Sequence, residues 1–176
     1  MRDGLVFSGV QDTICTENNE YARGMVMGRI SEILEAARQR GQELGLPYQG
    51  AVTPQEAYEL MQSAPGVKLV DVRTKAEMDW VGRMPDALEV EWILYPAMKM
   101  NPYFMAQLEQ EVSREAMVLF VCRSGQRSHH AAVAAMQAGY TSCFNMLEGF
   151  EGDRDDDGHR GRVNGWCAAG LPWEQT

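Results

Sequence analysis

The residues best suited to chemistry surround a cysteine that directly follows an apolar run. Met117 to Val121 reads Met-Val-Leu-Phe-Val, which is typical of a central strand covered on both faces, and Cys122 comes next. A short polar segment separates this cysteine from an alanine-rich, helical stretch over residues 126–137. In open α/β sheets, ligands bind beyond the carboxyl ends of the strands. Cys122 is therefore predicted to be a catalytic nucleophile.

The segment after Cys122 has the composition of an anion-binding loop. Its backbone N–H groups and the first turn of the following helix are expected to point at a common centre. Gly125 permits the positive φ that a tight loop requires, and two arginines add positive charge. This setting favours a thiolate without a histidine base. We predict that the loop amides and charges of Arg123, Ser124, Gly125, Gln126, Arg127 and Ser128 bind the substrate.

The other three cysteines carry weaker signals. Cys15, Cys143 and Cys167 are far apart in the sequence, so no C-x-x-C pair predicts a zinc site. Cys143 lies in a predicted strand and is expected in the core, and Cys167 is a second core candidate. A resolving role for either thiol stays open at this level. No metal is expected.

The amino-terminal fifty residues are predicted to form an extension with one amphipathic helix. Residues 1–18 show no periodicity and are expected to be a loop. From residue 19 to residue 44 the apolar positions fall three or four apart, and Val26, Ile30 and Ile33 share one face. We expect that face to pack on the rest of the chain or on a second subunit, which would make a homodimer. A glycine- and proline-containing linker follows over 45–50.

Residues 51–176 read as a second unit in which strands alternate with helices. Thr53 to Glu56 has the pattern of a capping box with proline at the first helical position. The expected helices cover about 53–63, 74–80, 102–114 and 126–137, with a short one near the end, and the expected strands cover 67–72, 88–92, 117–121 and 141–146. This alternation predicts an α/β fold around a largely parallel sheet flanked by helices.

Several of these segments together resemble the rhodanese family. The stretch from Cys122 to Ser128 resembles its active-site loop. Leu69-Val-Asp-Val-Arg-Thr with Glu77 resembles its Asp-Val-Arg segment, and Gly82-Arg-Met-Pro-Asp-Ala resembles its Gly-His-Ile-Pro-Gly-Ala turn. The stretches around Glu148-Gly-Phe and Gly165-Trp resemble the family's ending, so the resemblance extends over about 52–173. Arg83 and Asp86 depart from the usual histidine and glycine.

The resemblance implies a five-stranded rhodanese-like sheet and a two-step sulfur exchange. A thiolate at Cys122 would take the outer sulfur of thiosulfate, release sulfite, hold the sulfur as a persulfide, and pass it to cyanide or a thiol. The donor is expected to be a small anion, and a small thiol or a thioredoxin-like protein is a candidate acceptor. No cofactor is required. The alternatives are a non-catalytic partner-binding module and a cysteine phosphatase or arsenate reductase. The signature of these two enzymes is C-x5-R, whereas Cys122 and Arg127 form C-x4-R.

The composition limits the partners. The chain carries 16 basic and 25 acidic residues, a formal net charge of −9, which repels phosphate backbones and anionic lipids. Nucleic acid and membrane are therefore not expected as partners. No apolar run is long enough to span a bilayer, and the start of the chain lacks the features of a secretory signal. A cytoplasmic location is expected.

Three further patterns have modest interpretations. The segment from Asp153 to Gly158 is similar to the start of a calcium-binding loop, but its twelfth position is Asn164, so a solvated acidic turn is expected. Arg73 and Glu77 are spaced i, i+4 and are expected to form an ion pair. His129 and His130 fall in the first turn of the helix after the loop, where one could border the site or both could lie on the surface.

Overall fold

The computed structural model describes the backbone of residues 10–175 and the side chains of residues 23–175. The helices are α1 (Val10–Glu43), α2 (Pro54–Ser63), α3 (Lys75–Val81), α4 (Phe104–Glu111), α5 (Gln126–Gln137) and α6 (Gly165–Ala168). The strands are β1 (Gly50–Val52), β2 (Lys68–Asp71), β3 (Leu88–Glu89), β4 (Ile93–Leu94), β5 (Lys99–Met100), β6 (Met117–Val121) and β7 (Ser142–Met146). No helix in this described part is long and apolar enough to cross a membrane.

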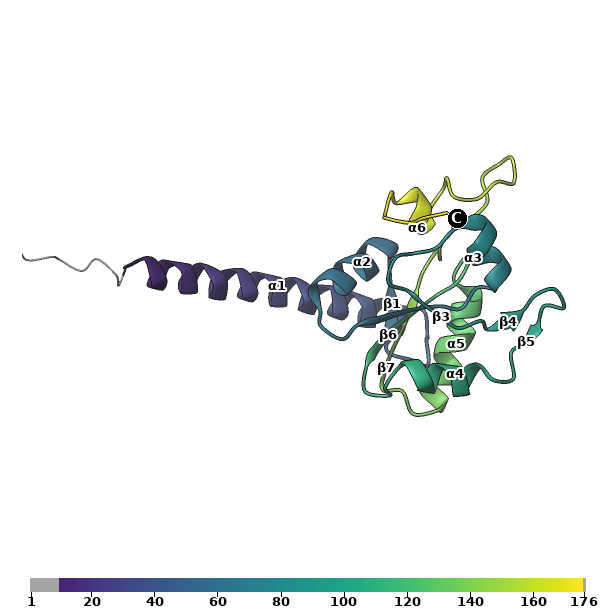
Figure 1. Ribbon diagram of the computed structural model, residues 1–176, viewed down its shortest axis with the longest axis horizontal. Helices are drawn as coiled ribbons and strands as arrows, with labels where there is room; N and C mark the ends of the chain where they lie inside the picture. The colour runs from purple at the N-terminus through teal and green to yellow at the C-terminus, as the bar shows by residue number, and fades with distance from the viewer. Residues whose placement is uncertain (1–9, 176) are drawn as a thin grey trace, which may run out of the picture.

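The main sheet has five parallel strands in the order β1-β7-β6-β2-β3, which confirms the predicted α/β fold. Strand β6 lies in the middle and is buried on both faces, as its continuous apolar sequence predicts. Val118 and Phe120 pack on one side with residues of α4 and α5, while Leu119 and Val121 pack on the other with α1, α2 and α6. Figure 1 shows this layered arrangement.

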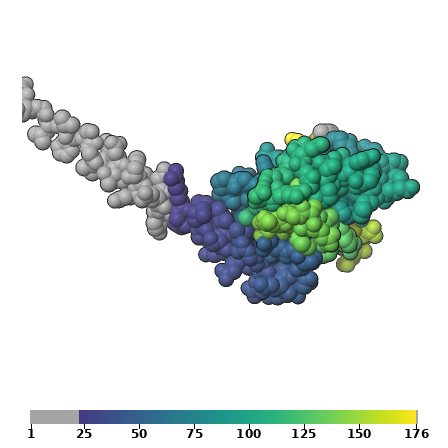
Figure 2. Space-filling view, turned by 90° about the horizontal axis from the view of Figure 1, so that it is seen from below, coloured from purple at the N-terminus to yellow at the C-terminus, as the bar shows by residue number. Residues whose placement is uncertain are grey.

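The amino-terminal helix is longer than the sequence pattern predicts. It begins at Val10 instead of residue 19, so the loop expected over 10–18 is wrong, and residues 1–9 lie outside the described part. Ile30 and Ile33 are buried against the domain as expected, but Val26 is exposed with all of 23–29. Figure 2 shows the helix leaving the domain body. Among the described side chains of α1, the apolar face therefore covers the core only from Ile30 onward.

Two short strand elements were absent from the sequence-based prediction. The expected linker ends in β1, whose residues Gly50 to Val52 pair with Phe144 to Met146 of β7 and complete the five-stranded sheet. Gly50 is required there because a Cβ would come within 2.2 Å of the Ala37 carbonyl oxygen of α1. The second addition is an antiparallel hairpin of β4 and β5, which pairs Ile93 with Met100 and Leu94 with Lys99.

Helix starts are fixed by side-chain caps. The capping box predicted at Thr53 and Glu56 is present, with reciprocal hydrogen bonds of 3.2 and 2.8 Å. A second capping box joins Thr74 and Glu77 at the start of α3. This second box lies directly after β2, and it fixes the position of the Glu77 carboxylate at the carboxyl edge of the sheet.

Candidate active site

Cys122 lies at the carboxyl end of the central strand, as predicted. Strand β6 ends at Val121, which is in register with Asp71 at the end of β2, and α5 begins at Gln126. Gly125 adopts φ +91° as the residue before the helix, which confirms its predicted left-handed conformation. The Cys122 side chain is only 1% exposed, so its sulfur lies at the bottom of the loop rather than on the surface.

The loop leaves a row of backbone donors unused. Within residues 10–175, no hydrogen bond starts from the backbone N–H groups of residues 123–128. The first helical N–H groups of α5 have no acceptor within the helix, which is general for helix starts. Unpaired N–H groups in such a curl form a site for negative charge. The N–H that follows, that of His129, already donates to the Gly125 carbonyl at 3.2 Å.

The loop is fixed from behind by the segment after β7. Phe150 N–H donates to the Cys122 carbonyl at 2.8 Å, and Glu151 N–H donates to the Arg123 carbonyl at 2.9 Å. The approach is close enough that a Cβ on Gly149 would lie 2.5 Å from the Cys122 carbonyl oxygen. The loop carbonyls are thereby directed at this segment, and the loop cannot relax away from it without breaking these bonds.

Ser128 supplies a hydroxyl directly to the sulfur. Its buried Oγ donates to Sγ of Cys122 at 3.3 Å. A hydroxyl that donates to a thiolate stabilises the negative charge on it. Ser128 was predicted only as part of the anion-binding loop, and the structure brings its side chain, as well as its backbone N–H, to the site.

Arg127 is joined to α3 rather than free in the pocket. Its guanidinium makes two hydrogen bonds of 2.7 and 2.6 Å to the Glu77 carboxylate. Burial alone would raise the pKa of Glu77, but the hydrogen bonds from Arg127 and Thr74 outweigh it and lower that pKa to about 2. Because its charge is compensated, Arg127 acts mainly as a brace between the loop and α3.

The predicted ion pair between Arg73 and Glu77 is wrong. Arg73 precedes the capping residue Thr74, so it is not on the helix, and the i, i+4 argument does not apply to it. Its side chain is instead fully buried, donates to Asp71 at 2.6 Å and to the Gly82 carbonyl at 2.8 Å, and stacks 4.0 Å from the Phe150 ring centre. Arg73 thus supports the segment that holds the loop.

Arg123 is the loop cation that points to solvent. Its side chain is exposed, and among residues 23–175, whose side chains are described, no hydrogen bond or salt bridge holds its guanidinium. Its positive charge does act on the nearby Glu151 carboxylate, whose pKa is raised by burial and lowered in part by Arg123. Of the two loop arginines, Arg123 is the one available to attract an anionic substrate.

One wall of the pocket over Cys122 is apolar, which the sequence did not predict. The cavity has a volume of about 460 Å³ and lies between the loop, α3 and the hairpin. Its apolar lining consists of Trp80 and Val81 from α3 and Ile93, Tyr95 and Met98 from the hairpin. The sequence signal for this wall is the uncharged stretch 92–98, which is too short and too irregular for a period to be recognised.

The remaining thiols and histidines lie in other surroundings. Burial raises the pKa of Cys143 to about 12 and that of Cys167 to about 11, so both thiols are poor nucleophiles at neutral pH. The core position predicted for Cys143 is confirmed, whereas Cys167 is only half-buried. His129 forms a 2.7 Å hydrogen bond with the Tyr48 hydroxyl, and neither His129 nor His130 lines the Cys122 cavity.

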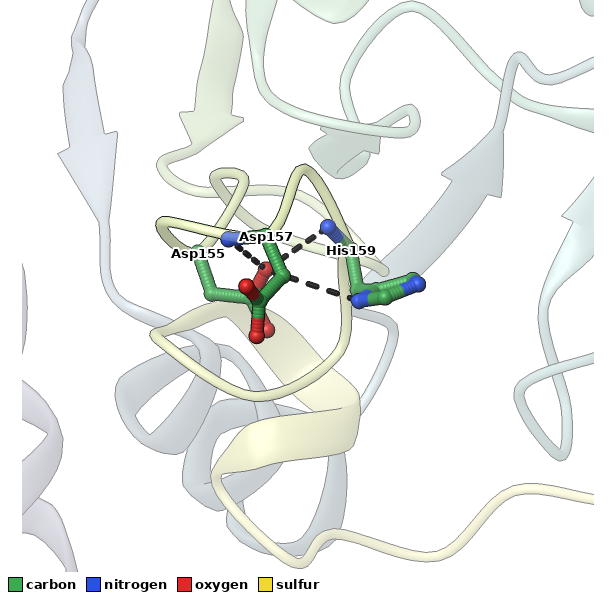
Figure 3. A group of neighbouring side chains, drawn as sticks. All are labelled: Asp155, Asp157 and His159. Carbon is green, nitrogen blue, oxygen red and sulfur yellow. Dashed lines mark hydrogen bonds and ion pairs between the residues drawn. The ribbon is translucent and has the colours of Figure 1, made fainter.

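The acidic segment forms a turn stabilised by its own carboxylate. Asp155 accepts hydrogen bonds from the N–H groups of Asp157 and His159 at 3.1 and 2.7 Å, and from Arg162 at 3.3 Å. Ligand atoms of Asp155, Asp157 and His159 lie within 4.8 Å of one another (Figure 3). Since the Asp155 oxygens are occupied by the turn, and Asp157 and His159 are exposed, the solvated-turn interpretation accounts for this cluster.

The fold and the site define a class: an α/β protein with a buried thiol at the base of an anion-binding loop. A family model described as "Rhodanese-like domain" matches residues 53–155. The chain belongs to this family. Asp86 departs from the glycine usual in its turn, yet adopts the left-handed conformation with φ +62°.

Individual relatives agree with this assignment. The crystal structure of Rv0390 from M. tuberculosis is 42% identical, covers 73% of this chain and 99% of its own, and has a TM-score of 0.66. A protein named sulfurtransferase from Allochromatium vinosum is 34% identical over 106 residues, 60% of this chain and 77% of its own. A Haemophilus influenzae protein named thiosulfate sulfurtransferase GlpE is 27% identical over 125 residues, which cover 71% of this chain and 94% of its own. This chain is accordingly of the sulfurtransferase type.

Proposed function

We propose that the protein transfers sulfane sulfur from thiosulfate or a similar anionic donor to a thiophilic acceptor, through a persulfide on Cys122. The observation that carries the proposal is the set of unused N–H groups of residues 123–128 around a buried thiol. Thiosulfate as the donor is further supported by the name of the Haemophilus relative. A reducing compartment such as the cytoplasm belongs to the proposal, because the nucleophile must stay a free thiol.

In the first step, the Cys122 thiolate attacks the outer sulfur of thiosulfate. A bond forms between Sγ and that sulfur, the sulfur–sulfur bond of thiosulfate breaks, and sulfite departs with the electron pair. Arg123 attracts the dianion, and Ser128 with the loop N–H groups stabilises negative charge on the sulfurs. In the second step, cyanide or a thiolate attacks the outer sulfur, and Cys122 leaves as a thiolate.

The length of the loop favours sulfur chemistry over phosphoryl transfer. Four residues separate Cys122 from Arg127, whereas the C-x5-R signature of cysteine phosphatases has five. A ring of donors acts only when it is set at hydrogen-bond distance from the developing charge. The shorter ring suits a single outer sulfur better than a tetrahedral phosphate. A non-catalytic binding module does not account for the intact thiol with its hydroxyl donor Ser128.

Intact-mass measurement tests the proposal. After anaerobic incubation with thiosulfate and removal of excess donor, the protein should gain the mass of one sulfur atom, and cyanide should remove it with release of thiocyanate. In parallel, the same preparation should not hydrolyse an aryl phosphate above background, and vanadate should inhibit sulfur transfer weakly at best. The absence of a sulfur adduct would contradict the proposal, as would Cys122-dependent phosphatase activity.

A further inference from the structure

An apolar surface continues outward from the Cys122 pocket along the β4–β5 hairpin. We call the exposed side chains of Trp80, Tyr95, Met98 and Met100 the hairpin surface. Trp80 contacts Tyr95 edge-on, and Met100 is paired with Ile93 of the cavity wall. Trp80 is 68% exposed and Met100 is 62% exposed, although both side chains are large and apolar. Figure 1 shows the hairpin projecting from the domain on the side away from the free end of α1. Contiguous apolar surface of this kind marks an interaction site.

The hairpin is anchored, so its exposed side chains form a fixed surface. Asn101 at its base donates to the Glu91 carbonyl and to Gln107, both at 2.8 Å, and its own N–H donates to the Trp92 carbonyl at 2.9 Å. The Trp92 ring packs edge-on against Phe104 of α4, with ring centres 4.9 Å apart. A surface held in place in this way loses little conformational entropy when a partner binds.

The extent of the hairpin surface distinguishes a protein partner from a small ligand. Trp80, Tyr95 and Met98 line the Cys122 cavity, and a small thiol in the cavity would contact them. Met100 does not line that cavity, and it instead borders a shallow groove with Trp92 and Val133 of α5. A ligand that fills the pocket would leave the Met100 side chain exposed. A peptide segment that crosses the hairpin would cover it.

The charges of the hairpin agree with such a partner. Residues 93–103 contain one charged side chain, Lys99, and no carboxylate, in a chain with a net charge of −9. Of the two arginines that line the cavity, Arg127 is paired with Glu77 and Arg123 is exposed. Aromatic residues, methionine and arginine are enriched at protein interfaces, and carboxylates are depleted there. The complementary segment is therefore apolar with an acidic residue.

We propose that the hairpin surface binds an extended, apolar, cysteine-bearing segment of a sulfur-accepting protein. This inference rests on the proposed function. Because Cys122 is almost fully buried, the accepting cysteine must reach inward from an extended segment instead of a flat folded surface. Its thiolate attacks the outer sulfur of the Cys122 persulfide, the bond from that sulfur to Sγ breaks, and Cys122 leaves as a thiolate. The outer sulfur and its proton move to the partner, so no oxidant is needed.

The test compares two cysteine peptides of equal charge as acceptors for the sulfur-loaded full chain. One is acetyl-Leu-Phe-Cys-Leu-Asp-amide and the other is acetyl-Ser-Asn-Cys-Ser-Asp-amide. The rate constant of transfer to the apolar peptide should exceed that to the polar peptide by at least about tenfold, a difference of about 1.4 kcal/mol. In the variant Met100→Ser the advantage should largely disappear, while discharge by cyanide stays within about twofold. The unchanged cyanide rate also shows that the variant is folded.

Met27→Ser is the matched control, since Met27 is 61% exposed on α1, far from the pocket. It should keep the preference for the apolar peptide. Equal rates for the two peptides, an unchanged preference in the hairpin variant, or a parallel loss of cyanide discharge would each overturn the inference.

Binding of fluorescently labelled peptides, with serine in place of cysteine, to the unloaded protein separates this inference from the proposed function. If no sulfur is loaded but binding of the apolar peptide depends on Met100, the inference about the hairpin surface holds and the proposed function fails. If sulfur is loaded and neither binding nor transfer depends on Met100, the inference about the hairpin surface is wrong.

Discussion

Cys122 directly follows β6, and Cys143 lies on the neighbouring parallel strand β7. Each cysteine is 1% exposed and borders a cavity, yet their surroundings differ. Cys122 follows the end of β6, where the adjoining N–H groups are unpaired and Ser128 donates to its sulfur. Cys143 lies near the start of β7, in register with Val118. Its cavity of about 370 Å³ includes Tyr48 and Tyr140.

The tyrosine hydroxyls near Cys143 are already occupied. Tyr48 is hydrogen-bonded to His129, and Tyr140 donates to the Val112 carbonyl at 2.9 Å. Burial without donors raises the pKa of Cys143 to about 12. The comparison teaches that two thiols buried to the same extent can have very different surroundings. Under the proposed function, the end of the sheet at which the thiol lies decides which one reacts, because strand ends that lead into helix starts provide free donors.

The largest expected effect comes from removing each thiol in turn. Cys122→Ser should abolish the gain of sulfur from thiosulfate, whereas Cys143→Ala should load one sulfur atom like the unmodified protein, because only the first thiol has donors around it. Intact-mass measurement followed by peptide mapping checks both variants. Sulfur found on Cys143 or Cys167 would contradict the expectation that only Cys122 has the donors needed to carry it.

Gly149, behind the loop, gives a sharper test of the difference between the two cysteines. In Gly149→Ala the added Cβ would lie 2.5 Å from backbone atoms of Cys122, Arg123 and Ser124, so the loop must shift. We expect sulfur loading to slow by at least about tenfold and the free energy of unfolding to fall by roughly 1–3 kcal/mol. Thiosulfate:cyanide turnover and urea denaturation measure the two effects.

Gly158→Ala is the control for the free-energy cost of placing an alanine at a positive φ. Gly158 also has a positive φ, +84°, but nothing lies within 4 Å of an added Cβ. This variant should lose about 1 kcal/mol of stability and keep its turnover. Similar turnover in the two alanine variants would show that the exact placement of the loop donors is unimportant.

Acid titration probes the brace between the loop and α3. The pKa of Glu77 is lowered from its ordinary 4.5 to about 2. The stabilisation from this carboxylate is therefore complete above about pH 4.5 and is lost as the pH falls toward 2, for a total of about 3 kcal/mol. Glu77→Gln should be less stable at pH 7 and lose less stability between pH 4.5 and 2. Urea unfolding at several pH values measures both, and parallel acid curves for the two proteins would exclude the brace.

The smallest effect is expected for the exposed cation. Arg123→Ala should raise the KM for thiosulfate by roughly two- to fivefold with little change in kcat, because exposed charges contribute up to about 1 kcal/mol. The KM for a neutral organic trisulfide should not change, and the difference for thiosulfate should shrink in 1 M salt. Equal losses with charged and neutral donors would mean that Arg123 shapes the loop instead of attracting the anion.

The sequence predicted the parts of the fold that follow from local patterns. The apolar run of β6, the positive φ of Gly125 and the capping box at Thr53 each rest on a few adjacent residues, and all three were confirmed. The predicted substrate-binding roles of the loop residues stay predictions, although the structure gathers them around Cys122. The division of the chain at residue 50 is likewise a prediction.

The missing parts depend on contacts between distant segments. Strand β1 has three residues and is stable only because β7 lies beside it, so the sequence around Gly50 reads as a linker. The partner of Glu77 is Arg127, fifty positions later, and spacing along one helix could not reveal it. The hairpin wall was missed for the same reason, since its two-residue strands are defined by their pairing with each other.

The position of α1 has a practical consequence for handling the protein. This helix leaves the domain on the side away from the β4–β5 hairpin (Figure 1). A dye or a bead could be attached without a cysteine, through an unnatural amino acid in place of Met27. It would then be held away from the mouth of the Cys122 cavity. Immobilised in that orientation, the molecule would present the mouth of the Cys122 cavity to the bulk solution, which suits single-molecule and surface-based tests of the proposed sulfur exchange.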